Sequence, residues 1–375
     1  MPQFAPPVTT LVDNARVEEH DLSIAAVPPP PDGKLQIVFI GTGCSSATPH
    51  LHCLLGTRKQ NSGPCAVCAA ALEGDPAENR NYRLNPSLLI RVRGGEDNDA
   101  TQHILIDAGK TFREAAQRWF PRWMRGSGGL DAVVITHEHA DAILGIDDLR
   151  SVQKSTSEGK KRSLPVFLSA QCYHHVANVF PYLQPQGSPE NKRMFIADLR
   201  WHVLDNRLHL HGLGLKDEDH WTSPPPLVPF SPVPGFMIDA FPVEHGPNFL
   251  SLGFAWGPLS SRTVYISDVS KVPPAILEAM RPASTSSPGK DNYGWSIDTL
   301  IVDCLDPGPD MYPSHFSLPQ TLDLVKELKP KRSLFVGMSH RFEHHMANKE
   351  LALLKTKIGL DVQLAYDGQC ITVAA

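Results

Sequence analysis

The feature that most constrains this chain is a histidine-rich segment placed directly after a short hydrophobic run. Residues 130–135 are mostly apolar and rich in β-branched side chains, which predicts a buried strand. His137 and His139 follow at once, and Asp141 stands two residues later. These side chains can converge on one point only if the backbone turns sharply after the strand. Neutral imidazole and carboxylate suit zinc, iron or manganese, so the pattern favours a metal site over a polar surface loop.

Two later segments also end an apolar run on a polar side chain. Residues 236–246 read as a strand that delivers His245 at its end, and residues 263–268 read as a strand with Asp268 at its tip. Strands are likewise expected at 35–40, 88–92, 103–106, 164–169, 252–256, 300–304 and 334–340, with two more between 194 and 211. Helices are expected at 111–123, 145–154, 171–180 and 319–328.

Composition limits the classes of protein that need to be considered. The 375 residues are 41% hydrophobic and 20% charged, with a formal net charge of −5, which gives no footprint for sequence-independent nucleic-acid binding. The N-terminus lacks the basic start and apolar core of a secretory signal, and no apolar run approaches the ~18 residues of a membrane span. We therefore expect a cytoplasmic protein without a membrane partner, with the nucleus also open to it.

Proline marks the loops and the expected domain boundary. The 34 prolines cluster, and residues 1–33 end in four of them followed by Asp-Gly, which predicts a Pro-rich N-terminal extension. Residues 34–375 are expected to form one domain, with loops at 216–235 and 282–290. The two strand-rich halves of that domain could be the two halves of one sandwich.

The seven cysteines favour metal binding over a disulfide framework, because their number is odd and three lie close together early in the chain. Cys65 and Cys68 form a Cys-x-x-Cys pair, which is a common half of a tetrahedral thiolate zinc site, and Cys53 is a candidate third ligand. A redox pair is the alternative interpretation. Cys44 is expected to be a buried thiol.

The string Thr136-His137-x-His139-x-Asp141, with Gly145 and residues 147–150 after it, resembles the signature of the metallo-β-lactamase-fold hydrolases. It is most similar to the branch that contains the phosphodiesterase of bacterial phosphonate breakdown. The resemblance runs from about residue 35 to the C-terminus. It implies an α/β fold, namely an αββα four-layer sandwich in which two mixed β-sheets are flanked by helices.

The resemblance also implies roles for particular residues. Asp107 corresponds to a buried aspartate that orients the metal-site loops, with a helix N-cap as the alternative role. Asp141 would orient the attacking water or accept its proton, and His315 would donate a proton to the leaving group, unless it only hydrogen-bonds locally at a helix start. The implied active-site ligands are His137, His139, Asp141, His245 and Asp268. The implied structural zinc ligands are Cys53, Cys65, Cys68 and His340.

The chain departs from the family pattern at two positions, Ala142 and Gly337, where second-metal histidines are expected. Neither side chain can donate an electron pair. We therefore expect one tightly held Zn²⁺ or Mn²⁺ in the active site, with a second ion weak or absent, beside the structural Zn²⁺. Residues 343–345, Glu-His-His, are an alternative source of ligands.

The expected function is hydrolysis of a small phosphodiester, cyclic or nucleotide-derived, by metal-activated water. Arg80, Arg83 and Arg150 are candidates for the positive charge that such a substrate needs, and surface ion pairing is their alternative use. Two other functions stay open: a thioester or lactone hydrolase at a mononuclear site, and a non-catalytic metal-binding member of the fold. The sequence also leaves open a homodimer.

Overall fold

The computed structural model describes residues 27–56, 65–94, 100–156, 158–184, 196–204, 227–282 and 294–375, and these residues build two β-sheets of seven strands each. The first sheet has the order β14-β1-β2-β3-β4-β5-β6. Its strands, in that order, are Cys370–Ala374, Lys34–Gly41, Ser87–Arg93, Thr101–Ile106, Ala132–Val134, Leu164–Leu168 and Leu199–Val203.

The second sheet has the order β13-β12-β11-β10-β9-β8-β7. Its strands, in that order, are Val362–Leu364, Arg332–Val336, Ile297–Asp303, Arg262–Ile266, Leu250–Trp256, Phe236–Glu244 and Val228–Val233. Both sheets are mixed, since each contains parallel and antiparallel pairs.

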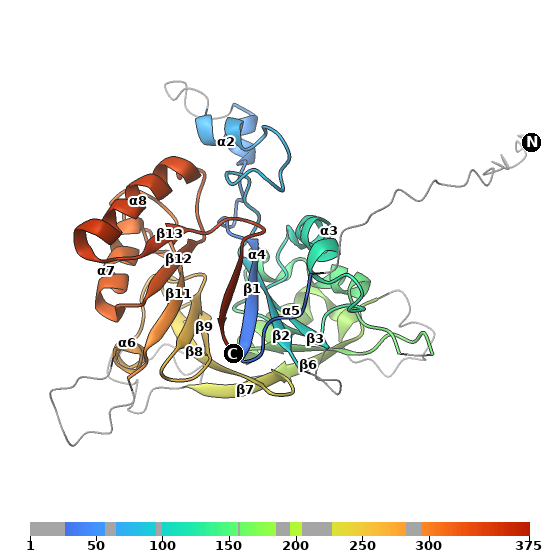
Figure 1. Ribbon diagram of the computed structural model, residues 1–375. Coiled ribbons are helices and arrows are strands. Elements are labelled where there is room, and N and C mark those ends of the chain that lie inside the picture. The colour runs from blue at the N-terminus through green and yellow to red at the C-terminus, as the bar shows by residue number, and fades with distance from the viewer. Residues whose placement is uncertain are drawn as a thin grey trace, which may run out of the picture.

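Helices cover the outer face of each sheet, and the two sheets face each other (Figure 1). The longer helices are α3 (Phe112–Trp123), α5 (Ala170–Val179), α6 (Pro274–Met280), α7 (Leu318–Leu328) and α8 (His344–Ile358). The short ones are α1 (Leu51–Leu54), α2 (Ala66–Ala70) and α4 (Ala140–Ile143), with 3-10 turns η1 (Ile146–Ser151) and η2 (Pro181–Leu183). None of the helices described here is both long and apolar enough to cross a membrane.

The layering follows from the alternation of side chains along each strand. In β2, Leu88 and Ile90 point into the core between the sheets, whereas Leu89 packs in the core beneath α3 and α5. In β11, Ile301 joins the central core and Leu300 packs beneath α6, α7 and α8. Both faces of these strands are buried, which explains why they read as continuous apolar runs. The predicted αββα sandwich is confirmed.

This topology gathers the ends of several strands at one edge. In the first sheet β3 and β4 are parallel, and in the second sheet β10, β11 and β12 are parallel. Strand β8 has the same direction as β10, because each pairs antiparallel with β9. The carboxyl ends of parallel strands meet at the same edge. The segment after β4 is tied to β9 of the other sheet by the bond from the Leu252 N–H to the Thr136 carbonyl, 3.0 Å.

Two sequence expectations need correction, and a third is met in part. The helix expected at 145–154 is the 3-10 turn η1, in which Ile146 and Leu149 are buried three residues apart, the spacing that a 3-10 turn places on one side. The loop expected at 216–235 contains β7, whose prolines are tolerated because β7 is an edge strand. Of the two strands expected within 194–211, β6 is present, and residues 205–211 lie outside the described residues.

Several expectations fall wholly or mainly outside the described residues. These are the N-terminal extension up to residue 26, residues 205–211, the loop at 216–226 and the loop at 283–290. Strands β13 and β14 and helices α6 and α8 were not anticipated from the sequence. The division into an extension at 1–33 and a domain at 34–375 stays a prediction.

His103 on β3 generates a test of acid stability. Burial lowers the pKa of this imidazole to about 3, whereas the unfolded chain titrates near ~6.5. Below ~6.5 the unfolded state therefore takes up a proton that the folded state does not, and stability is lost as the pH falls. The His103→Gln variant keeps a donor for the Trp123 carbonyl. Between pH 7 and pH 5, its free energy of unfolding should fall by about 2 kcal/mol less than that of the wild type. Urea unfolding at both pH values measures this difference, and equal losses would contradict it.

Candidate metal centres

Three imidazoles from two sheets meet at the edge where the parallel strands end. His137 and His139 follow β4, and His245 follows β8. One ring nitrogen from each lies within 4.8 Å of the others, and the His245 Nε2 is 3.1 Å from the His139 Nδ1. The ring centroids are 4.7 to 5.0 Å apart. The sequence-predicted imidazoles are therefore brought together.

A relay of hydrogen bonds orients His137. Asp107, which is buried just after β3, accepts bonds from the Thr136 N–H and hydroxyl, both at 2.8 Å. Because that hydroxyl already donates to Asp107, the His137 Nδ1–H donates to the Thr136 oxygen at 2.8 Å. The His137 Nε2 is then left with a lone pair. Asp107 thus orients the loop as the resemblance implies, and the residue that caps α3 is Thr111.

His245 is oriented in the same manner from the other sheet. Its Nδ1 donates to the Ser314 carbonyl at 2.6 Å, which leaves Nε2 for the cluster. Metal-binding histidines usually donate their second ring N–H to an oxygen acceptor. Both His137 and His245 meet that condition here.

A second group of candidate ligands shares His245 with the first. It contains Asp268, which follows β10, and His315, and the three ligand atoms lie within 4.8 Å of one another. The His315 Nδ1 lies 2.8 Å from an oxygen of Asp303 and 3.9 Å from an oxygen of Asp268. His315 therefore joins the site and does not merely start α7, where Ser317 forms the capping box.

The surroundings favour a neutral imidazole at His137, a charged carboxylate at Asp268 and a charged imidazole at His315. Burial lowers the pKa of His137 to about 3. Burial raises the pKa of Asp268, but His137, His245 and His315 outweigh it and bring that pKa to about 2. Burial lowers the pKa of His315, but the charge and hydrogen bond of Asp303 raise it to about 9.

The donor set fits a divalent metal. The His137 Nε2 is buried and has no hydrogen-bond partner among the described residues, although a buried nitrogen left unpaired is costly. Imidazole nitrogens and a carboxylate are ligands that zinc and manganese both accept. His137, His139 and His245 could hold such an ion together, and Asp268 shares the second group with His245.

Asp141, Ala142 and Gly337 contribute no ligand atom to either cluster of the described chain. Asp141 is buried in α4, but its oxygens belong to neither cluster in the described chain. Burial, with Asp268, raises the pKa of Asp141. Ala142 is also buried in α4, and Gly337 follows β12 with a φ of 74°. A side-chain carbon at Gly337 would lie 2.4 Å from an oxygen of Asp303, so this position has little room for a ligand.

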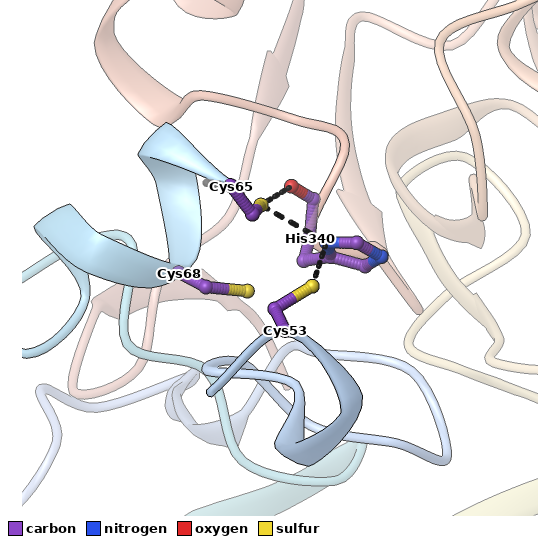
Figure 2. A group of neighbouring side chains, drawn as sticks. All are labelled: Cys53, Cys65, Cys68 and His340. Atoms are coloured by element: carbon purple, nitrogen blue, oxygen red, sulfur yellow. Dashed lines mark hydrogen bonds between the residues drawn. The ribbon is translucent and has the colours of Figure 1, made fainter. Parts of the chain in front are cut away.

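The second predicted centre is made of three thiols and an imidazole (Figure 2). Cys53 from α1, Cys65 and Cys68 at the start of α2, and His340 after β12 place their ligand atoms within 4.8 Å of one another. The His340 Nδ1 is 3.2 Å from the Cys65 sulfur and 3.5 Å from the Cys53 sulfur. Cys53 and His340 are 287 residues apart in the chain.

This thiol cluster resembles a tetrahedral metal site more than a redox pair. Four donors surround one point, as structural zinc sites require, and the seven cysteines are free thiols. Burial raises the pKa of Cys68 to about 12. Burial also raises the pKa of Cys65, but hydrogen bonds from the Cys68 backbone and thiol outweigh it, so that pKa is lowered. Cys44 is a separate buried thiol, as expected.

The alternative ligands at 343–345 serve α8 instead. Glu343 caps this helix by accepting the Met346 N–H at 2.7 Å and also accepts from Asn81 at 2.7 Å. His344 is buried, with its Nε2 2.9 Å from the Asn348 amide. Neither Glu343 nor His344 joins a metal cluster in the described chain.

The three arginines proposed as substrate contacts have other partners. Arg83 is fully buried and donates to the carbonyls of Ser339 and Phe342. The Arg80 guanidinium lies over the Tyr366 ring, 4.4 Å from its centroid. Arg150 pairs with Asp147 at 3.1 Å within η1. Arg83 therefore cannot contact a substrate, and the other two are held elsewhere.

Sequence reasoning missed three residues beside the site. Asp303 is the last residue of β11. The pattern that identified Asp268, an apolar strand that ends on a carboxylate, could therefore have identified Asp303 as well. Phe249 stacks on His139 with centroids 4.3 Å apart and an interplanar angle of 11°. Lys110 lies in the turn after β3, and its positive charge partly offsets the rise in the pKa of Asp141 that burial and Asp268 cause. No signal in the sequence distinguishes Phe249 or Lys110 from an ordinary loop residue.

Comparisons with known proteins show the family and the fold. Residues 102–338 match a family model described as beta-lactamase superfamily domain. A diphosphatase of the PhnP family has a similar structure over 91% of this chain and 99% of its own, with 23% identity and a TM-score of 0.60. Zinc-bound PqqB from Methylobacterium extorquens is similar over 90% of this chain and 99% of its own, with 16% identity and a TM-score of 0.55. At these identities the likeness shows the fold.

A curated octanoyltransferase from Porphyromonas gingivalis is 22% identical over 317 residues. The match covers 84% of this chain and 48% of the octanoyltransferase, so the chain spans about half the length of that relative.

Replacing Cys65 by serine tests the thiol cluster. We expect Cys65→Ser to lose one equivalent of metal and about 2.7 kcal/mol of unfolding free energy, the stabilisation that a ligand at one hundred times its Kd supplies. Elemental analysis and urea unfolding measure the two effects. Cys370→Ser is the matched control, because Cys370 is half-buried and belongs to no cluster of the described chain. Unchanged metal content in Cys65→Ser would contradict the assignment.

Proposed function

Because the chain belongs to the beta-lactamase superfamily, we propose that it is a metal-dependent hydrolase and that its substrate is a small phosphodiester, cyclic or nucleotide-derived. The observation that carries the proposal is the convergence of His137, His139 and His245 beside Asp268 at the ends of strands from both sheets. The three imidazoles alone would leave the fourth position of a tetrahedral ion for water or substrate, as catalytic zinc sites do.

The proposed metal content is one tight Zn²⁺ or Mn²⁺ at the imidazole cluster and one structural Zn²⁺ at the thiol cluster. A divalent ion held by imidazoles and a carboxylate supplies Lewis-acid polarisation of a phosphoryl oxygen and activation of water near neutral pH. A second active-site ion would lack side-chain ligands at Ala142 and Gly337 and would be weak or absent.

The chain's own residues handle the protons. Water attacks phosphorus, and the bond from phosphorus to the leaving oxygen breaks. The attacking water loses one proton, and the leaving oxygen gains one. Asp141, buried beside the cluster, orients the water or accepts its proton. His315 donates the proton that the leaving oxygen needs, since its Nδ1 is engaged by Asp303 and its Nε2 is left for the substrate. Phe249 covers one face of His139 and limits the access of bulk water to that ligand.

The substrate class is chosen from chemistry and from the fold relatives together. One relative with a similar fold is a diphosphatase, so phosphorus–oxygen bonds are the first class to test. The acyl chemistry named for the octanoyltransferase relative makes thioesters and lactones the second class. Fold alone is a weak guide to substrate, so the assay has to decide between the two.

Metal counting tests the proposed content directly. Purified protein should contain two equivalents of tightly held metal, and His137→Ala combined with Cys65→Ser should contain none. Elemental analysis after exhaustive dialysis gives these numbers. Three tightly held equivalents in the wild type would show that a second active-site ion binds although Ala142 and Gly337 provide no ligand. That result would refute the mononuclear site.

Turnover of bis-p-nitrophenyl phosphate with added Mn²⁺ or Zn²⁺ tests the reaction. His137→Ala should reduce kcat/KM at least ~100-fold, since it removes a ligand of the activating ion. His174→Ala is the control, because His174 is exposed on α5 and belongs to no metal cluster of the described residues. Turnover of thioesters or lactones alone would replace the phosphodiesterase by an acyl hydrolase. Tight metal binding without turnover of either class would indicate a non-catalytic member of the fold.

A further inference from the structure

We propose that Lys110 and Ser45 form an anion-binding subsite that holds a non-bridging phosphoryl oxygen of the substrate beside Asp141. The inference rests on the proposed phosphodiester substrate and adds to it the residues that recognise the charge. It assigns to one lysine the role that none of Arg80, Arg83 and Arg150 fulfils.

The backbone fixes Lys110 next to Asp141. Gly109 packs so tightly against the Asp141 backbone that a side-chain carbon at 109 would lie 1.7 Å from the Asp141 carbonyl oxygen. The Lys110 N–H donates to the Ala140 carbonyl at 3.2 Å, and the Ala108 N–H donates to the Ala142 carbonyl at 2.9 Å. The turn after β3 and the helix that carries Asp141 are therefore held as one unit, and the position of Lys110 does not depend on its side chain.

The side chain reaches a second loop that is also fixed in place. The Lys110 Nζ lies 3.4 Å from the Ser45 Oγ. The Asn85 amide holds this loop by donating to the Cys44 carbonyl at 3.0 Å and the Ser45 carbonyl at 3.1 Å. The Asn85 N–H in turn donates to the Thr111 hydroxyl at 2.9 Å, one residue after Lys110. Asn85 thus joins the two loops, so an ammonium and a hydroxyl are presented side by side.

The charge of Lys110 is available to a ligand. Lys110 is exposed and forms no ion pair with any carboxylate of the described chain, unlike Lys154, which is paired with Asp131 at 2.7 Å. Lys110 directly follows Gly109, whose backbone packs against that of Asp141. Asp141 lies at the position where Ala142 and Gly337 leave no second-metal imidazoles.

A phosphodiester brings a negative charge into a site already occupied by Asp141, Asp268 and Asp303. One divalent ion offsets this repulsion less than two would. An ammonium at Lys110 compensates for part of the missing positive charge, since lysine binds phosphate as a compact point charge. Ser45 supplies a hydroxyl donor to the same oxygen. This arrangement favours an anionic phosphoryl substrate over a neutral ester.

Inorganic phosphate is the probe, because its binding can be measured without turnover. Calorimetric titration of phosphate into the metal-loaded protein should give a Kd that rises at least about tenfold in Lys110→Met, in line with the loss of one charged hydrogen bond. Lys110→Arg, which keeps the charge, should stay within about threefold of wild type. Lys349→Met, at an exposed lysine on α8, is the matched control and should bind as wild type does.

Ser45→Ala gives an independent variant and should weaken phosphate binding by a smaller factor, about threefold. Metal content and melting temperature are measured for every variant, so a loss caused by misfolding is recognised. An unchanged phosphate Kd in Lys110→Met that retains its metal would overturn the subsite. A tenfold rise in a variant that keeps its metal supports it.

The two proposals fail in different ways. If phosphate binding depends on Lys110 but no phosphodiester is turned over, the subsite stands and the proposed reaction is wrong. If diesters are turned over and Lys110→Met binds phosphate and shows the same KM as wild type, the reaction stands and the subsite is wrong. With both correct, Lys110→Met raises the KM for the diester much more than it lowers kcat.

Discussion

The convergence of parallel strand ends at one edge of the sandwich is the constraint on which the candidate active site depends. His137 and Asp107 come from the first sheet, and His245, Asp268 and Asp303 come from the second. A strand end is a suitable place for a ligand, because the ladder behind it is rigid and the chain beyond it can turn. The bond between Leu252 and Thr136 ties the two sheets close to the ligands. The metal cluster is therefore a property of how the sheets pack, and no single segment contains it.

Buried hydrogen bonds decide which atoms of these ligands are available. Asp107 acts through Thr136 on His137, and the Ser314 carbonyl acts on His245. In both cases one ring nitrogen is used and the other is left without a proton. This arrangement is costly without an ion, because the His137 Nε2 is buried and lacks a partner within the described structure. Asp303 likewise accepts a hydrogen bond from the Nδ1 of His315, which places a charged donor at the same edge.

The thiol cluster has a different task, since it joins the beginning of the domain to its end. Cys53 lies in α1 and Cys65 caps α2, the helix that Figure 1 shows projecting from the sandwich, and His340 follows β12. Short helices such as α1, with no buried residue, have little apolar packing to hold them. A metal crosslink would supply that stability. Arg83 reinforces the same junction, which is why it is buried and cannot serve a substrate.

The sequence by itself determined the period of the strands, the helices α3, α5 and α7, and the residue types at the strand ends. These are local properties: alternation of apolar side chains, and histidine or aspartate directly after an apolar run. The family resemblance carried by the motif at Thr136 added the order of the layers, which the structure confirms. The metal assignments and their roles remain predictions supported by the geometry. What only the tertiary structure decided is which distant groups share a point: Asp303 with His315, Phe249 with His139, and Lys110 with Ser45. Those pairings depend on the packing of one sheet against another and on loop conformations fixed by Asn85 and Thr136, and no pattern within a single segment records them.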